Sequence, residues 1–540
     1  MNIGHGGLAA ALVLLAGVAR AETPRAVLAD PLEWLYPDSR VETARPLAET
    51  DVPANGVAEA NVLVNGLRVG ETVTLAGDAP EGEWFVCHDV PVEKNTGLEG
   101  NVESAAVTNR FVTRDAPFRV YDALEPLSGG KVAATGGTMA FRYRLRKFPR
   151  VGAVDVTLSV AQGAFRATLP LRVNVHAAEV PPVGPASFKY TNWMNYESMA
   201  TSHGLKPWSE AHWQMIKRYV ALAVYGRQSM VQVRVFHDGW RIDEEKTARF
   251  VAMLDKLGVA WLEGPHLCHF SGGNWHDKSF APHGCTNLST SAVGAAHLGR
   301  MAALLAALVE KRGWKDRWYQ HVADEPADHN VKEYRMTCAV VRKHMPGFRL
   351  FDAVETPDMA GALDAYCPKN NVYETRQPEF DALRTRPSDE LWCYTCCFPG
   401  GKWMNRLLDN EILRPVLIPW GCHLFRLDGY LHWGYNQFTR ANDPLLVGVV
   451  PDAHIDLKLP PGDRNIVYAG PDGPWPSVRL EAMRQGFEDL ELLRLLARHD
   501  PSAAAALVRR VMRGFGDYTT DPLVYRAARR DLLVAVSRAK

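Results

Sequence analysis

Two adjacent carboxylates at the end of an aromatic segment are the residues best suited to chemistry in this chain. The segment WYQHVADEP runs from Trp318 to Pro326, and it places Asp324 and Glu325 directly before the proline. Its aromatic and β-branched residues are typical of a buried strand. Pro326 disfavours helical geometry for Glu325, so we expect a bend that turns both side chains into one cleft. The alternative is a solvated turn, in which acidic pairs before proline are also common.

The overall composition is that of a globular protein with room for two or three domains. The chain has 540 residues, of which 47% are hydrophobic and 23% charged, and its formal net charge is zero. No basic tract or stripe is present, so nucleic acid is not an expected partner. The 15 Trp and 17 Tyr residues suit a flat, uncharged ligand such as a sugar, although large barrels are also rich in aromatic residues.

The amino terminus has the pattern of a secretory leader. Leu8 to Val18 is an apolar run, and Ala19, Arg20 and Ala21 supply a small-x-small cleavage site. We interpret residues 1–21 as a signal peptide cleaved near Ala21, so the mature protein should be exported to the periplasm or beyond. No later run looks long and apolar enough for a transmembrane helix.

Residues 22–185 have the pattern of antiparallel β-structure. Short runs such as Asn61–Asn65 and Val154–Leu158 lie between turn residues, and several alternate apolar with polar positions. This spacing predicts a β-sandwich, either a structural companion or a sugar-binding module. The Pro-rich stretch Val180–Pro185 forms the boundary.

Residues 186–450 alternate between strand and helix patterns, which predicts a parallel α/β fold. Eight strands with intervening helices are what a (β/α)8 TIM-type barrel contains. The alternative is a doubly wound sheet, but no GxGxxG or Walker loop supports it. The predicted strands are Phe188–Trp193, Met230–Val235, Ala260–His266, Trp318–Ala323, Arg349–Val354, Asn371–Glu374, Leu391–Thr395 and Gly429–Trp433.

Residues 451–540 should form a last strand and a C-terminal helical cap on the barrel. Ser477 is the expected N-cap of a helix with Leu480, Met483, Phe487 and Leu490 on one face. The predicted fold is therefore a β-sandwich, a (β/α)8 barrel and a helical cap.

A barrel keeps its active site at the carboxyl ends of its strands. Those ends predict an aromatic cup with a few carboxylates, which suits stacking against sugar rings and proton transfer. Glu374 is a weaker candidate. The predicted substrate-binding residues are Asn192, Trp193, His266, Glu355, Trp392, Tyr394, Trp433, Tyr435 and Asn436.

The seventh strand gives no acid that could serve as the nucleophile of an ordinary retaining glycosidase. It ends Trp392–Cys–Tyr394, and Glu390 precedes it. In substrate-assisted hydrolysis the 2-acetamido oxygen of the sugar attacks instead, so one acid and one stabilising carboxylate suffice. Asp324 would remain ionised and Glu325 protonated, with a pKa raised by burial and by the neighbouring anion. Hydrolysis by Glu325 and Glu355 is the alternative.

Three motifs resemble glycoside hydrolase family 123. They are HVADEP at His321–Pro326, GYLHW at Gly429–Trp433 and SVRLEAMRQGFED at Ser477–Asp489. The resemblance, over about Phe188 to Leu496, implies a β-sandwich and a (β/α)8 barrel. It also implies a retaining β-N-acetylgalactosaminidase, with Asp324 stabilising the oxazolinium and Glu325 as general acid/base.

No metal and no cofactor are expected. His266, Cys268, His269, His283 and Cys285 match no standard zinc spacing. The favoured interpretations are a cleft lining or a short disulfide loop between Cys268 and Cys285. The expected partner is a glycan or oligosaccharide. A catalytically silent carbohydrate-binding or surface protein on the same scaffold is the competing interpretation.

Overall fold

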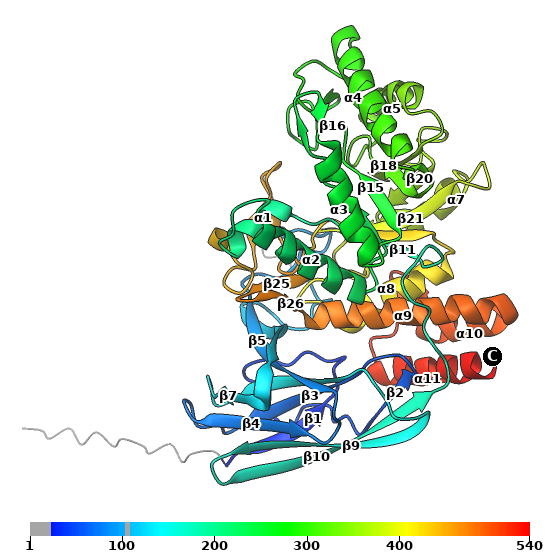
Figure 1. The fold of residues 1–540 in the computed structure, drawn as a ribbon. Helices are drawn as coiled ribbons and strands as arrows, with labels where there is room; N and C mark the ends of the chain where they lie inside the picture. The colour runs from blue at the N-terminus through cyan, green and yellow to red at the C-terminus, as the bar shows by residue number, and fades with distance from the viewer. Residues whose placement is uncertain (1–22, 103–108, 540) are drawn as a thin grey trace, which may run out of the picture.

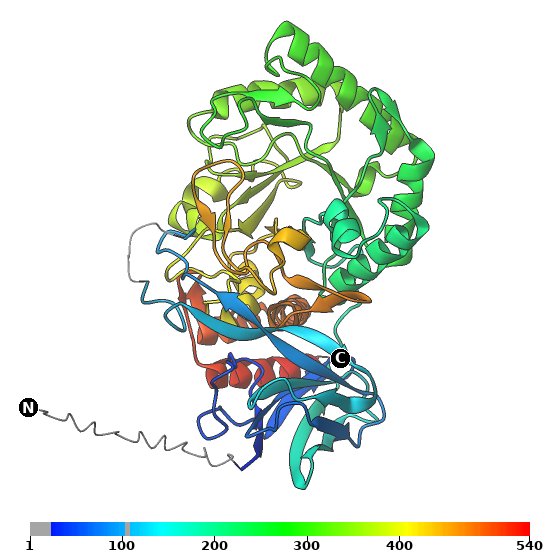
Figure 2. The same ribbon diagram turned by 90° about the vertical axis from the view of Figure 1, so that its left-hand side faces the viewer.

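The computed structural model describes residues 23–102 and 109–539. The predicted signal peptide, including Ala21, lies outside these residues. The described chain forms an N-terminal sheet region, a ring of strands and helices, and three C-terminal helices that lie between the two (Figures 1 and 2).

The N-terminal region consists of two five-stranded sheets. The first has the order β1–β3–β8–β5–β6 and the second β2–β10–β9–β4–β7. Both contribute to one buried cluster, with Val62 and Phe141 from the first and Leu158 and Val173 from the second. The strand bounds are β1 Arg25–Ala29, β2 Glu49–Pro53, β3 Ala58–Asn65, β4 Thr72–Gly77, β5 Gly82–Val92, β6 Phe118–Leu127, β7 Lys131–Ala133, β8 Met139–Leu145, β9 Gly152–Gln162 and β10 Phe165–His176.

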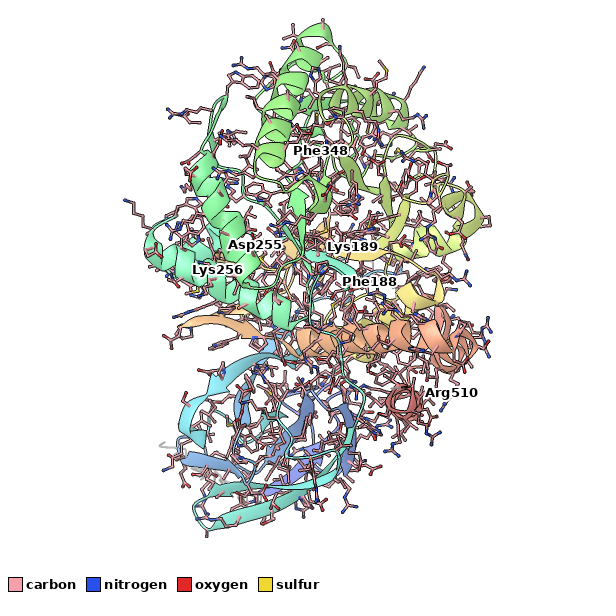
Figure 3. The ribbon with its side chains drawn as sticks, turned by 45° about the vertical axis from the view of Figure 1, so that its right-hand side comes forward. Phe188, Lys189, Asp255, Lys256, Phe348 and Arg510 are labelled. Carbon is pink, nitrogen blue, oxygen red and sulfur yellow. The ribbon has the colours of Figure 1, made fainter. Side chains whose placement is uncertain are left out.

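Eight parallel strands then form a nearly closed barrel. Their order is β11–β22–β21–β20–β19–β18–β15–β12, and the backbone N–H of Ser229 joins the two ends by donating to the carbonyl of Tyr190 at 3.1 Å. The chain enters the barrel at Phe188 and Lys189 (Figure 3). The strand bounds are β11 Lys189–Asn192, β12 Met230–Gln232, β15 Trp261–Gly264, β18 Trp318–Gln320, β19 Arg349–Val354, β20 Ala365–Pro368, β21 Glu390–Thr395 and β22 Gly429–His432.

Seven of the eight predicted barrel strands are confirmed, and the sixth is wrong. Residues Asn371–Glu374 lie in helix α6 (Asn370–Thr375), whereas the sixth strand is β20, a few residues earlier. Pro368 is the last residue of β20, and α6 begins two residues later. The short run Asn–Val–Tyr–Glu has no periodicity that separates a strand from a helical turn.

The helices around the barrel confirm the predicted alternation. Helix α4 is the one helix among the described residues long and apolar enough to cross a membrane, but it buries Leu298, Ala302 and Leu305 in the protein core, as core helices do. The helix bounds are α1 Tyr196–Ser202, α2 Glu210–Tyr225, α3 Glu244–Lys256, α4 Ala292–Lys311, α5 Val331–His344, α7 Gln377–Asp381 and α8 Leu413–Leu424.

Helix α9 (Val478–His499) connects the barrel to the N-terminal sheets, with α10 (Pro501–Val511) and α11 (Pro522–Arg538) packed against it. Ser477 caps α9, as predicted, by accepting from the backbone N–H of Leu480. Gly486 allows α9 to approach α8 closely, because a Cβ there would lie 2.2 Å from the Val416 carbonyl oxygen. Gly486 belongs to the RQGFED part of the third family motif.

A buried ionic cluster fixes α9 to the first sheet. Arg484 of α9 pairs with Glu481, with Glu488 and with Glu59 of β3, each with an N···O distance of 2.8 or 2.9 Å. Arg144 of β8 pairs with Glu481 at 2.9 Å. Removing one member of such a buried cluster leaves an uncompensated charge, so the cluster holds the relative positions of sheet and barrel.

Candidate active site

Asp324 and Glu325 lie at the barrel mouth, directly after the segment that contains β18. Both side chains are half-buried. Glu325 has φ of +44°, the left-handed region that non-glycine residues rarely adopt and that costs on the order of 1–3 kcal/mol. This bend interrupts the strand alternation that would send neighbouring side chains to opposite faces. The next loop supports it, because the Glu355 N–H donates to the Pro326 carbonyl at 2.9 Å.

Two glutamates meet at the hydroxyl group of Tyr394, and Lys369 binds one of them. This hydroxyl hydrogen-bonds Glu325 Oε1 and also lies 2.6 Å from Oε1 of Glu355. Lys369 Nζ donates to the same Oε1 of Glu355. Burial raises the pKa of Glu325, with a smaller contribution from Glu355, although Lys369 and Tyr394 oppose the rise. Glu325 is therefore a carboxyl group inclined to keep a proton.

Lys369 supplies the positive charge of this group. Although burial alone would lower the pKa of Lys369, the carboxylates of Glu355 and Glu325 raise it overall. The ammonium group is therefore charged and stabilises the anionic forms of both glutamates.

Asp324 has a different environment from its neighbour. Among the described residues, its Oδ1 atom is buried and has no hydrogen-bond partner. Burial, followed by the charge of Glu325, raises its pKa well above the usual range, and His321 opposes this shift. A buried carboxyl oxygen without a partner is costly, so it is a natural contact for a polar group of a ligand.

A buried histidine lies behind the pair. His321 is enclosed between Glu263 Oε1, 2.6 Å from its Nε2, and Asp352 Oδ1, 2.5 Å from its Nδ1. Although burial lowers the pKa of His321, these two carboxylates raise it to about 10. Trp193 joins the network by donating its indole N–H to Glu263 Oε1 at 2.5 Å. The imidazolium thus links an aromatic residue of the mouth to the strand that bears the acidic pair.

Three further predicted residues lie at the mouth. Trp193, His266 and Trp433 are half-buried. The His266 ring stacks on that of His321, with 4.2 Å between the ring centroids. The indole of Trp433 donates to Asp463 Oδ1 at 2.9 Å, and Trp193 and Trp433 both pack on the apolar cluster inside the barrel. They lie at the same end of the barrel as Glu355 and Tyr394.

Trp392 and Tyr435 do not reach the mouth. Trp392 has no exposed surface, and its indole donates at 2.9 Å to Glu390, the first residue of β21. It therefore fills the barrel interior toward the opposite end. Tyr435 is also fully buried and donates its hydroxyl to the Tyr219 carbonyl on α2 at 2.9 Å. A sequence reading places both near strand ends but does not give the direction of their side chains.

Asn192 and Asn436 are likewise buried and have structural partners. Asn192 Oδ1 accepts from buried Arg406 at 2.6 Å. Asn436 exchanges two hydrogen bonds with the backbone of Asn195, at 2.9 and 3.0 Å. Their side-chain groups are thus engaged within the protein rather than directed to a sugar.

Lys369, Glu263 and Asp352 belong to the site but were not predicted. Lys369 directly follows β20, so the incorrect sixth strand hid its position at a strand end. Glu263 and Asp352 lie inside predicted strands, and a charged residue within a buried strand is the signal that could have revealed them.

His266, His321 and Asp352 are the one group in residues 23–102 and 109–539 whose His, Cys or acidic donor atoms lie close enough to hold a metal ion. Both nitrogens of His321 already lie at hydrogen-bonding distance from carboxylates, an arrangement that suits an imidazolium. Cys268 and Cys285 are free thiols rather than the disulfide considered from the sequence.

The comparisons with known proteins agree with this architecture. The model of the glycoside hydrolase 123 catalytic domain matches residues 193–272 and 285–496. A family 123 glycoside hydrolase from Clostridium perfringens has a similar structure, with a TM-score of 0.66 and 10% sequence identity over 96% of this chain and 97% of that one.

More distant structures include a GH5 xyloglucanase from Bacteroides ovatus, with a TM-score of 0.32 and 8% identity over 86% of this chain and all of the other. A comparison with curated protein sequences gave no significant match. Because the family model covers more than half of the chain, this protein belongs to glycoside hydrolase family 123 and is a glycosidase.

Proposed function

We propose that this enzyme hydrolyses a β-linked 2-acetamido sugar with retention of configuration, by substrate-assisted catalysis at Asp324 and Glu325. The observation that carries the proposal is the adjacent carboxyl pair in two unlike environments. Glu325 contacts Tyr394 and lies close to Lys369, whereas Asp324 Oδ1 has no partner among the described residues. A site that splits acid and stabiliser roles needs such a difference.

In this mechanism Asp324 receives the acetamido N–H and stabilises the positive charge of the oxazolinium. Glu325 protonates the leaving-group oxygen and then deprotonates the attacking water. In the free enzyme, burial and repulsion favour a proton on Asp324. The bound N–H would provide the missing partner of Oδ1, which stabilises the Asp324 anion and moves the proton of the pair to Glu325.

The substrate class follows from the family and the mouth. The similar enzyme from Clostridium perfringens was studied for glycolipid glycan hydrolysis. We propose an N-acetylgalactosamine-like sugar on a glycan, held against Trp193 and Trp433, both half-buried at the mouth. Because the family is one of glycosidases, a silent binding protein is not retained as the alternative.

Ordinary retaining hydrolysis with Glu355 as nucleophile is the second candidate. Glu325 Oε1 and Glu355 Oε1 contact the same Tyr394 hydroxyl, so they are at most about 5 Å apart, close to the separation in two-carboxylate retaining enzymes. Against this role, Glu355 Oε1 is bound by Lys369 as well as Tyr394, which reduces its nucleophilicity.

A pair of aryl β-glycosides separates these mechanisms. One carries the 2-acetamido group and the other a 2-hydroxyl group. The proposal expects turnover of the acetamido sugar only, with strong inhibition by a thiazoline that mimics the oxazoline. Comparable turnover of both sugars, with a trapped glycosyl-enzyme on Glu355, would instead establish the second candidate.

We also propose the organisation expected from the sequence. Residues 1–21 would direct export, 22–185 would form a β-sandwich, 186–450 the catalytic barrel and 451–540 a strand and helical cap. The shared buried cluster of the two N-terminal sheets and the packing of α9 on α8 support the last three assignments.

A further inference from the structure

A cavity of about 660 Å³ lies beside the catalytic pair and is not formed by it. Residues after β12 and β15 line it, with side chains from α1, α4 and the hairpin β13–β14 (His237–Asp238 and Arg241–Ile242). Of the residues predicted for the site, only His266 contributes to its wall. Its volume lies within the range of small-molecule sites.

Three ring side chains, those of Trp193, His266 and His321, separate the cavity from the proposed active site. His266 stacks on His321, three residues before Asp324. Trp193 meets the rings of His266 and His321 edge-on, with centroid distances of 5.1 and 5.6 Å. Met194 and Asn195, which follow Trp193, line the cavity. A ligand lying along Trp193 would therefore reach from the pair into this space.

The cavity and the partners of Glu325 lie on opposite sides of the barrel mouth. In the ring of eight strands, β12 and β15 are across from β20 and β21. Tyr394 lies near the end of β21, and Lys369 directly follows β20. A general acid must lie beside the leaving-group oxygen. The leaving group should therefore lie on the β20–β21 side. The cavity then faces the opposite side of the scissile bond, where the cleaved 2-acetamido sugar is bound.

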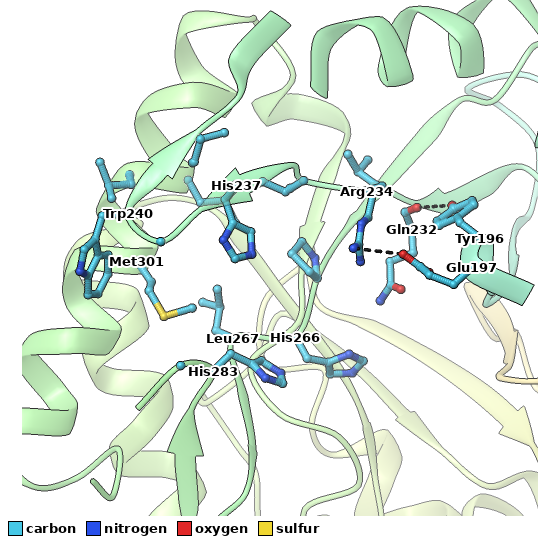
Figure 4. Close-up of a pocket in the computed structure, with 18 of the residues that line it drawn as sticks. Tyr196, Glu197, Gln232, Arg234, His237, Trp240, His266, Leu267, His283 and Met301 are labelled. Atoms are coloured by element: carbon cyan, nitrogen blue, oxygen red, sulfur yellow. Dashed lines mark hydrogen bonds and ion pairs between the residues drawn. The ribbon is translucent and has the colours of Figure 1, made fainter. Parts of the chain in front are cut away.

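The lining has an apolar end and a neutral polar end. Figure 4 shows Trp240 and Met301 at one end and the Arg234–Glu197 ion pair, with an N···O distance of 3.2 Å, at the other. His237 lies between these ends.

The charges of the cavity are balanced. Arg234 and Glu197 neutralise each other. Burial, with help from His269 and His237, lowers the pKa of His283, so its ring is neutral at pH 7. An uncharged ligand with an apolar face and several hydroxyl groups, such as a sugar ring, matches this lining.

We propose that this cavity is a second glycan subsite, which binds an uncharged sugar attached to the non-reducing side of the cleaved residue. The inference rests on the proposed function, because it uses Glu325 as the acid on the leaving-group side. The enzyme would then release an oligosaccharide whose reducing-end unit is the 2-acetamido sugar, rather than trimming single terminal sugars.

The test compares short and extended substrates. The short one is an aryl β-glycoside of the 2-acetamido sugar, and the extended ones carry a further hexose on O3 or O4. At least one extended substrate should have a kcat/KM about tenfold higher than the short one, the change given by about 1.4 kcal/mol of added binding. Hydrolysis of the short substrate without hydrolysis of either extended one would overturn the proposal.

Variants locate the subsite. The preference for the extended substrate is the ratio of its kcat/KM to that of the short one. Trp240→Ala should remove most of this preference, and Trp240→Phe should retain it by keeping an aromatic face. Trp475→Ala is the matched control, because Trp475 lies on β26 (Gly473–Pro476) and is not part of the cavity. A ratio that Trp240→Ala leaves intact would contradict the assignment.

A binding measurement distinguishes failure of the subsite from failure of the proposed chemistry. The same disaccharides, without the aryl group, are titrated calorimetrically into Glu325→Gln and into Glu325→Gln with Trp240→Ala. Weaker binding by about tenfold in the double variant supports the subsite even if no aryl glycoside is hydrolysed. Equal affinity in both proteins, or no binding to either, overturns it.

Discussion

The Nδ1 atom of His321 lies 2.5 Å from Oδ1 of Asp352 inside the barrel wall. The other carboxylate oxygen of Asp352 accepts the backbone N–H groups of Val322 and Ala323, at 2.9 and 3.0 Å. Asp352 thus holds both the side chain of His321 and the backbone that leads into Asp324. The bend at Asp324 and Glu325 is positioned by a buried ionic network rather than by a regular strand.

Replacement of His321 by Gln should destabilise the protein strongly. Gln is neutral, so neither Glu263 nor Asp352 would keep a positively charged partner. Breaking a buried pair in this way costs on the order of 3–5 kcal/mol. Thermal denaturation of both proteins measures the loss, with the exposed His499→Gln as control.

The pH dependence of that loss is a sharper check. The folded pKa of His321 is about 10, above the usual 6.5, so its contribution to stability is complete below pH 6.5 and disappears as the pH rises through 10. The Tm difference between wild type and His321→Gln should therefore shrink from pH 6 to pH 10. A difference that grows over this interval would mean that His321 is neutral in the folded protein.

Lys369→Met should move the alkaline limb of the pH–rate profile to higher pH. The ammonium group lowers the pKa of Glu325, and it also compensates Glu355, which raises that pKa. Its removal therefore lets Glu325 keep its proton to a higher pH. The limb is measured from kcat against pH, with exposed Lys343→Met as control. A shift to lower pH would refute Glu325 as the acid.

Trp433 and Tyr435 should behave differently although they are two residues apart. Trp433→Ala removes a half-buried ring from the mouth and should raise KM about fivefold, as expected for the loss of about 1 kcal/mol of stacking. Tyr435→Phe removes only the buried bond to Tyr219 and should lower stability by about 1 kcal/mol with KM unchanged. A raised KM for Tyr435→Phe would place the phenol at the substrate after all.

The sequence was sufficient for the barrel wherever the strand patterns were bounded by clear signals. The segment WYQHVADEP predicted β18 and the acidic pair, and Ser477 predicted the start of α9. It failed at the sixth strand, where Ala–Tyr–Cys–Pro is followed closely by the similar run Asn–Val–Tyr–Glu on α6. Local patterns cannot rank two such neighbouring runs.

The site was less predictable than the fold, because strand ends specify position but not direction. Tyr394 and Trp392 both lie on β21, yet Tyr394 contacts Glu325 at the mouth and Trp392 contacts Glu390 at the start of the same strand. The positive φ of Glu325 also depends on tertiary contacts, such as the bond from Glu355 to Pro326. Pro326 predicts a bend at Glu325, but no local pattern gives its left-handed φ or the direction of the β21 side chains.

The two carboxyl groups should respond differently to the leaving group. Glu325→Gln should lower kcat by roughly 10²–10⁴ for a poor leaving group that needs a proton. The loss should be much smaller for dinitrophenol, which departs without one. Asp324→Asn should impair both substrates alike, because the oxazolinium forms in each case.

Glu374→Gln is the matched control for these variants, since Glu374 lies on α6 and accepts a hydrogen bond from the Phe515 backbone. If Glu325→Gln impaired both leaving groups equally and Asp324→Asn neither, the assignment of roles would be reversed or wrong.

The most direct test of substrate assistance uses aryl β-glycosides whose 2-acetamido group carries none, one, two or three fluorine atoms. Fluorine withdraws electrons from the carbonyl oxygen, so kcat/KM should fall steeply at every added fluorine if that oxygen is the nucleophile. A kcat/KM that remains level across the four substrates would show that the oxygen does not attack, and would contradict the assignment of Asp324 as the stabiliser of an oxazolinium.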